Sequence, residues 1–110
     1  MKPKWYYCPT WRQNFYFFIG WKPADFEKYV LKTYGHSANI GAAKGRALVM
    51  DRGDESRYLI WTISKDASIV AHECLHVTNW MLSERGYKFD PMNDEPHAYL
   101  LGALMREALK

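Results

Sequence analysis

The sequence contains few cysteines, no long apolar run and no block of like charges. Its two cysteines, Cys8 and Cys74, are too few for a disulfide framework. No apolar stretch approaches the roughly 20 residues that span a bilayer. Residues 1–6 carry positive charge but lack the apolar segment and small-residue cleavage site of a secretory signal. We therefore expect a soluble, cytoplasmic protein that has no membrane partner.

A dedicated nucleic-acid surface is not indicated either. The formal net charge is only +3, and the lysines and arginines are spread along the chain without a run of five or more. We therefore do not expect nucleic acid as a partner, although a basic patch that forms only in the folded protein stays open.

Length and composition predict a globular domain. The chain has 110 residues, 48% of them hydrophobic and 25% charged, which suffices for one modest core but no second domain. No internal repeat, low-complexity tract or linker is visible. We therefore treat residues 1–110 as a single domain.

The first half of the chain predicts a strand, a helix and a hairpin. Residues 14–21 are aromatic and β-branched, as in a strand. Pro23 opens a helix that ends at Gly35, with Phe26, Val30 and Thr33 on its inner face and Tyr29 beside them. Residues 35–45 are small and glycine-rich. The segment 41–45 lacks the spacing and the Lys-Ser/Thr ending of a phosphate-binding loop, so we interpret it as a plain connection. Two further strands, 47–50 and 58–63, flank a polar turn over 51–56.

The second half predicts two helices. Asp66, or Ser64 before it, caps a helix that runs to about Arg85, with Gly86 as its stop. Residues 87–94 form a loop, and a last helix runs from about Glu95 towards Lys110. The predicted fold is therefore a small α+β domain in which an antiparallel or mixed sheet packs on helices.

The most informative motif is His72-Glu73-Cys74-Leu75-His76, which spells HExxH. Side chains four residues apart lie on one face of a helix, so two imidazoles there can bind one zinc ion. The intervening Glu73 lies beside the metal, where it can accept a proton from the bound water. Cys74 lies on the helix face turned away from both histidines, where a small buried thiol is the expected role.

Catalytic zinc has three protein ligands and an open position for water. Glu95, 19 residues beyond His76, is the best third ligand, because the last helix can fold back and present a carboxylate from its first turn. Glu95, Tyr99, Gly102 and Arg106 fall on one stripe of that helix, and close packing against the motif helix would explain Gly102. His97 and Asp90 are the rival third ligands.

These residues predict a mechanism of peptide hydrolysis. Zinc lowers the pKa of its bound water, Glu73 accepts the proton, and the resulting nucleophile attacks a peptide carbonyl. Tyr99 is the candidate donor to the oxyanion, with a buried aromatic at the helix interface as its alternative role. A strand of the hairpin would bind an extended peptide by edge pairing.

The motif context resembles a known family. Residues 69–76, followed by the acidic Asp94-Glu95 and residues 98–101, resemble the small zincin-like metallopeptidases encoded by tailed bacteriophages. These are of the gluzincin type, in which a glutamate on the following helix is the third ligand. The resemblance spans residues 64–106. It implies zinc at His72, His76 and Glu95, with Glu73 as the base, in the cytoplasm of a host bacterium. Unlike larger gluzincins, this chain has no room for a C-terminal subdomain.

The sequence thus supports two main hypotheses. The first is a zinc-dependent peptidase that acts on a protein or peptide substrate. The second is a binding protein that keeps the zincin scaffold and blocks a host protein, such as a defence complex, with zinc as a structural element. Glu73 favours the first, because a purely structural zinc site does not need a base. A nucleic-acid-associated zinc protein is a third, weaker hypothesis, and it would show strongly salt-dependent binding.

Overall fold

The computed structural model describes all of residues 1–110. Its elements follow in the order β1 (Lys4–Cys8), β2 (Gln13–Ile19), α1 (Pro23–Tyr34), β3 (Gly45–Arg52), β4 (Glu55–Thr62), α2 (Ala67–Glu84) and α3 (Glu95–Leu109). The four strands and three helices confirm the predicted α+β class.

The four strands form one mixed sheet in the order β1-β2-β4-β3. β2 and β4 are parallel, whereas β1 pairs with β2 and β3 pairs with β4 in antiparallel register. Two parallel neighbours require a crossover connection, and α1 supplies it. β3 and β1 are consequently the two edge strands.

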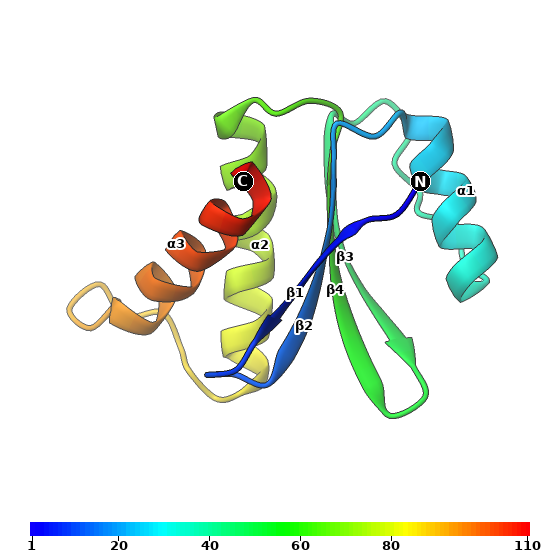
Figure 1. Ribbon diagram of the computed structural model, residues 1–110. Helices are drawn as coiled ribbons and strands as arrows, with labels where there is room; N and C mark the ends of the chain where they lie inside the picture. Colours follow the sequence, from blue (N-terminus) through cyan, green and yellow to red (C-terminus); the bar gives the residue numbers. More distant parts are fainter.

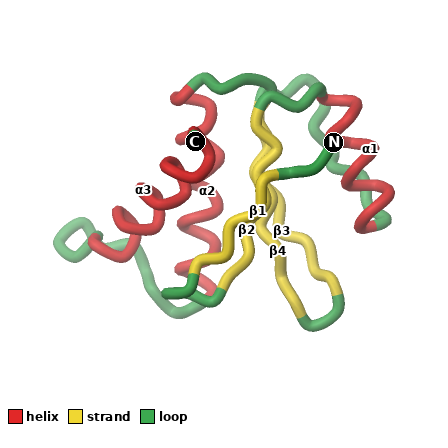
Figure 2. The backbone as a smooth tube through the Cα atoms, in the orientation of Figure 1, coloured by secondary structure: helices red, strands yellow, loops and turns green.

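Helices cover both faces of the sheet. α2 and α3 lie on one face and α1 lies on the other (Figures 1 and 2). Side chains alternate accordingly along β2, where Phe15 and Phe17 pack towards α2 and α3 while Phe18 packs towards α1. The central strand β4 is buried without interruption over its last five residues, as expected for a strand that is covered on both faces.

The core on the α1 face is mostly aromatic. Phe18 contacts Phe26 with ring centroids 4.9 Å apart, and Phe26 stacks on Trp61 at 5.4 Å. Phe26 and Val30 are fully buried, and Thr33 and Tyr29 are half-buried. The predicted inner face of this helix is therefore confirmed.

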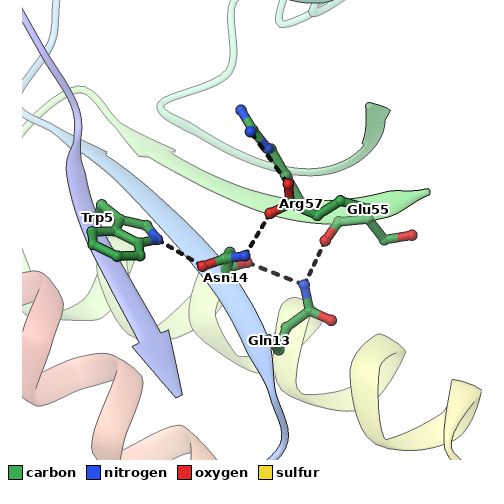
Figure 3. A network of polar contacts seen from close by, with 6 residues as sticks. Trp5, Gln13, Asn14, Glu55 and Arg57 are labelled. Atoms are coloured by element: carbon green, nitrogen blue, oxygen red, sulfur yellow. Dashed lines mark hydrogen bonds and ion pairs between the residues drawn. The ribbon is translucent and has the colours of Figure 1, made fainter. Parts of the chain in front are cut away.

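A polar network joins β1, β2 and β4 near the β3–β4 hairpin (Figure 3). The Trp5 indole of β1 donates to the Asn14 side chain of β2 at 2.7 Å. The Asn14 amide in turn donates to Glu55 of β4, and Glu55 forms an ion pair with Arg57 at 3.3 Å. Gln13 donates to the Ser56 carbonyl at 2.6 Å. These contacts hold three strands in register next to the β3–β4 hairpin.

Two details differ from the sequence predictions. β1 was not predicted, although Lys4–Cys8 pairs with β2 along its whole length. The turn predicted over residues 51–56 is confined to Gly53 and Asp54, because the backbone reverses within two residues where Gly53 has φ +64°. β3 and β4 are therefore longer than predicted.

None of the three helices combines the length and the apolar composition that a membrane crossing requires.

Candidate metal centre

The motif residues lie near the middle of α2, which has a defined N-terminus. The Asp66 carboxylate accepts hydrogen bonds from the Ser68 amide at 2.9 Å and the Ser68 hydroxyl at 2.6 Å, so Asp66 is the N-cap predicted from the sequence. These bonds lower the pKa of the Asp66 carboxyl below its ordinary value. Both histidines follow within the next three turns.

His72 and His76 point towards each other. Their Nε2 atoms are 3.1 Å apart and their ring centroids 4.7 Å apart. Two imidazole nitrogens bound to one tetrahedral zinc, each at about 2.0–2.1 Å, are separated by about 3.3 Å. The two rings therefore already have nearly the spacing of zinc ligands, and both are exposed to solvent.

Glu73 is the buried member of the motif. Only 7% of its surface is exposed, and its Oε2 lies 4.0 Å from the His72 Nε2. Burial raises the pKa of the Glu73 carboxyl, while the neighbouring His72, His76 and Arg46 act in the opposite direction. One donor atom from each of His72, Glu73 and His76 lies within 4.8 Å of the others, so the three side chains can contact one metal ion.

The Glu73 side chain packs against Gly45 at the start of β3. A Cβ atom at this position would lie 2.9 Å from both the Cγ and the Oε2 of Glu73, and 3.1 Å from the Cγ2 of Ile69. Gly45 does not have a positive φ, so no turn requires a glycine there. The close approach of β3 to α2 requires it instead.

A pocket of about 370 Å³ opens beside these residues. It is lined by Ala43, Lys44, Gly45, Ser68, Ile69, His72 and Glu73. The end of the segment 41–45, interpreted from the sequence as a plain connection, therefore contributes to the site. The sequence carried no clear signal for this contact, because Gly45 lies at the end of a segment predicted as a loop.

The far side of the histidine pair is bounded by an aromatic ring. The Trp80 ring stacks on the His76 ring at 5.7 Å with an interplanar angle of 24°, and it is 39% exposed. Trp80 thus covers the side of the His76 ring that faces away from His72.

Cys74 occupies the buried face of α2, as predicted. It is fully buried, and burial raises the pKa of its thiol to about 12. Cys74 lies on the side of the helix opposite to His72 and His76, so its thiol does not point towards them. Cys74 is therefore a core residue.

The structure does not place Glu95 with the histidines. Glu95 is the exposed first residue of α3 and lies outside the group of donor atoms around His72 and His76. The rival third ligands, His97 and Asp90, also lie outside this group of donor atoms. His97 is buried against Phe89 at 5.3 Å, and the exposed Asp90 accepts a hydrogen bond from the Met92 amide at 2.9 Å.

The stripe of α3 that carries Glu95 faces solvent. Tyr99 is 75% exposed, so the alternative of a buried aromatic at the helix interface is wrong. Gly102 is exposed, and an added Cβ would meet no atom within 4 Å, so the predicted close packing against α2 is also wrong. The reason is that α3 buries a different stripe, formed by His97, Leu100, Leu104 and Ala108.

Comparison with known proteins identified no matching protein family, no matching curated protein and no matching solved structure.

Proposed function

We propose that this protein is a zinc-dependent peptidase that uses His72 and His76 as metal ligands and Glu73 as the general base. The single observation that carries the proposal is the spacing of 3.1 Å between two exposed Nε2 atoms beside a buried carboxylate. Imidazole nitrogens are common zinc ligands, and a carboxylate beside the ion can accept a proton from a bound water.

In the proposed peptide hydrolysis, the zinc ion and Glu73 have different roles. Zinc, when bound, lowers the pKa of a water and polarises a carbonyl. The Glu73 carboxylate accepts the proton of the attacking water at Oε2 and later donates it to the leaving amine. A raised pKa suits this role, because a base works best when its pKa approaches the working pH.

The sheet edge supports a peptide substrate. β3 is an edge strand, so its outer backbone groups have no strand partner within the chain. An extended peptide added there would run past Gly45, which is in contact with Glu73.

Lys44 is a better candidate hydrogen-bond donor to an oxyanion than Tyr99. Lys44 lines the pocket beside His72 and Glu73, whereas the exposed Tyr99 does not.

One observation favours the second function, a binding protein with a structural zinc. The carboxylate nearest to the histidines is Glu73 itself, and Glu95 is not within reach. If Glu73 is the third zinc ligand, it cannot act as a base. The protein would then block a partner, such as a host defence protein, through its surface.

The variant Glu73→Gln separates the two functions. We expect the zinc-loaded protein to cleave members of a peptide library, and Glu73→Gln to lose cleavage while it retains stoichiometric zinc. Glu27→Gln, an exposed substitution on α1, is the matched control and should keep full activity. Loss of zinc in Glu73→Gln, together with no cleavage by the wild type, would establish Glu73 as a ligand and favour the binding protein.

A further inference from the structure

A second pocket, which shares no lining residue with the pocket beside the motif, contains lysines from distant parts of the chain. Lys2, Lys4, Lys65 and Lys110 line one cavity of about 230 Å³. These residues come from the N-terminal segment, β1, the β4–α2 connection and the C-terminal end. In Figure 1 the two termini and the β4–α2 connection lie in the upper half, and β1 runs from there into the lower half. The fold therefore creates a basic patch that the sequence left open as a possibility.

Two of these lysines are engaged within the protein. The Lys4 ammonium donates to the backbone oxygens of Glu107 and Lys110, both at 2.9 Å. The Lys110 ammonium pairs with the Glu107 carboxylate at 3.0 Å. Because an ammonium group has three donors, Lys4 is held in place and still has one N–H to offer.

The other two lysines have no anionic partner. None of the three ion pairs of the protein includes Lys2 or Lys65. No acidic side chain lines the cavity. Like charges that share one small cavity repel each other, and a bound anion would remove this repulsion.

The floor of the cavity is apolar. Phe17, Ile19, Trp21 and Ala108 form it between the lysines. The combination suits a ligand with an anionic head and a small apolar group. We infer that this cavity binds a small phosphate-bearing molecule, whose phosphate contacts Lys2, Lys4 and Lys65 and whose apolar part covers Ile19 and Trp21.

The volume of the cavity favours a small ligand. A protein that binds a nucleic-acid strand neutralises several successive phosphates along a groove. Here the lysines surround one cavity of about 230 Å³, which is smaller than a drug-sized ligand pocket. One phosphate group with a short apolar substituent matches this volume.

Calorimetric titration with phenyl phosphate and inorganic phosphate tests the inference. We expect saturable 1:1 binding of phenyl phosphate that is tighter than that of inorganic phosphate, because only phenyl phosphate covers the apolar floor. Lys2→Gln and Lys65→Gln should each raise the dissociation constant about tenfold, as expected for the loss of a charged contact. Backbone amide NMR shifts should centre on Ile19 and Lys65.

Lys28→Gln, an exposed lysine of α1, removes the same charge at a different place and is the matched control. An unchanged dissociation constant in this variant supports the site. Absence of saturable binding, or equal weakening in Lys28→Gln, would overturn the inference. It would also be overturned if a single-stranded oligonucleotide bound with steep salt dependence and phenyl phosphate failed to compete with it.

Discussion

Of the three side chains in the candidate metal centre, His72, Glu73 and His76, folding buries only Glu73. The two histidines remain exposed, so their chemistry depends on the helix alone, whereas that of Glu73 depends on a neighbouring strand. The contact with Gly45 is what makes this burial possible. The histidine spacing could be predicted from the sequence, because it follows from one helical turn. The Gly45 contact could not, because it joins residues from two separate elements.

Gly45→Ala should destabilise the protein and displace the Glu73 side chain. An added methyl group would overlap the carboxylate, and overpacking of this kind costs about 1–3 kcal/mol. Urea denaturation measures the change in the free energy of unfolding. In a Glu73→Ala background the same substitution should cost clearly less, because the overlapping side chain is gone.

Gly102→Ala is the internal comparison. Its added methyl group meets nothing, so it should stabilise α3 by about 0.5–1 kcal/mol. Equal effects of the two glycine substitutions would contradict the proposed role of Gly45.

At the scale of elements, the extents of the helices and the inward faces of α1 and α2 were predictable, whereas the inward face of α3 was not. Pro23 and Gly35 placed α1, and Asp66 and Gly86 placed α2, within a few residues of their observed ends. The extent of α3, from about Glu95 towards Lys110, was predicted without a cap or a glycine stop. The side of α3 that packs inward was predicted from Glu95, Tyr99 and Gly102, and this was wrong. The apolar residues Leu100, Leu104 and Ala108 decide the orientation, because their burial removes apolar surface from water.

β1 shows a similar limit at the level of strands. Lys4–Cys8 is short and follows a proline, and its stability comes from pairing with β2 and from the packing of Cys8 and Tyr6. Such an edge strand depends on contacts that local propensity does not contain.

The Asp66 cap should make the stability of the protein depend on pH. Its pKa is lower in the folded protein than in the unfolded chain, so its contribution is complete above about pH 4 and disappears as the pH falls through the lower, folded value. Asp66→Asn keeps a capping side chain that does not titrate. The stability difference between wild type and Asp66→Asn, measured by urea denaturation, should therefore decrease between about pH 5 and pH 2. A difference independent of pH would show that the carboxylate charge does not contribute.

At the scale of the whole molecule, the class of fold followed from the sequence, whereas the sheet order did not. The order of one strand, one helix, two strands and two helices predicted an α+β domain. The parallel pairing of β2 with β4 and the edge position of β3 both depend on the spatial order of the strands in the sheet. Local sequence patterns do not contain this order. That edge position is what exposes a backbone beside the motif.

Zinc should stabilise the protein as a whole. A ligand present at about 100 times its dissociation constant adds about 2.7 kcal/mol to the free energy of unfolding if it binds only the folded state. Thermal denaturation with and without zinc should therefore show a higher Tm for the wild type. His72→Ala and His76→Ala should lose this increase.

Glu95→Ala is the informative comparison, because the resemblance to gluzincins assigns Glu95 to the metal and the structure keeps it apart. We expect the zinc-dependent rise in Tm to remain in this variant. If it disappears as completely as in His76→Ala, then α3 must move when zinc binds.

The attachment of α2 to the sheet has a consequence for ion capture. Val70, Cys74, Val77 and Met81 anchor this helix across the sheet, and all four are fully buried. The histidines project from the opposite side of the same turns, so the backbone that carries them is already ordered before any ion arrives. Little conformational entropy remains to be lost on coordination, and the affinity for the ion should depend mainly on its dehydration and on the number of ligands it gains.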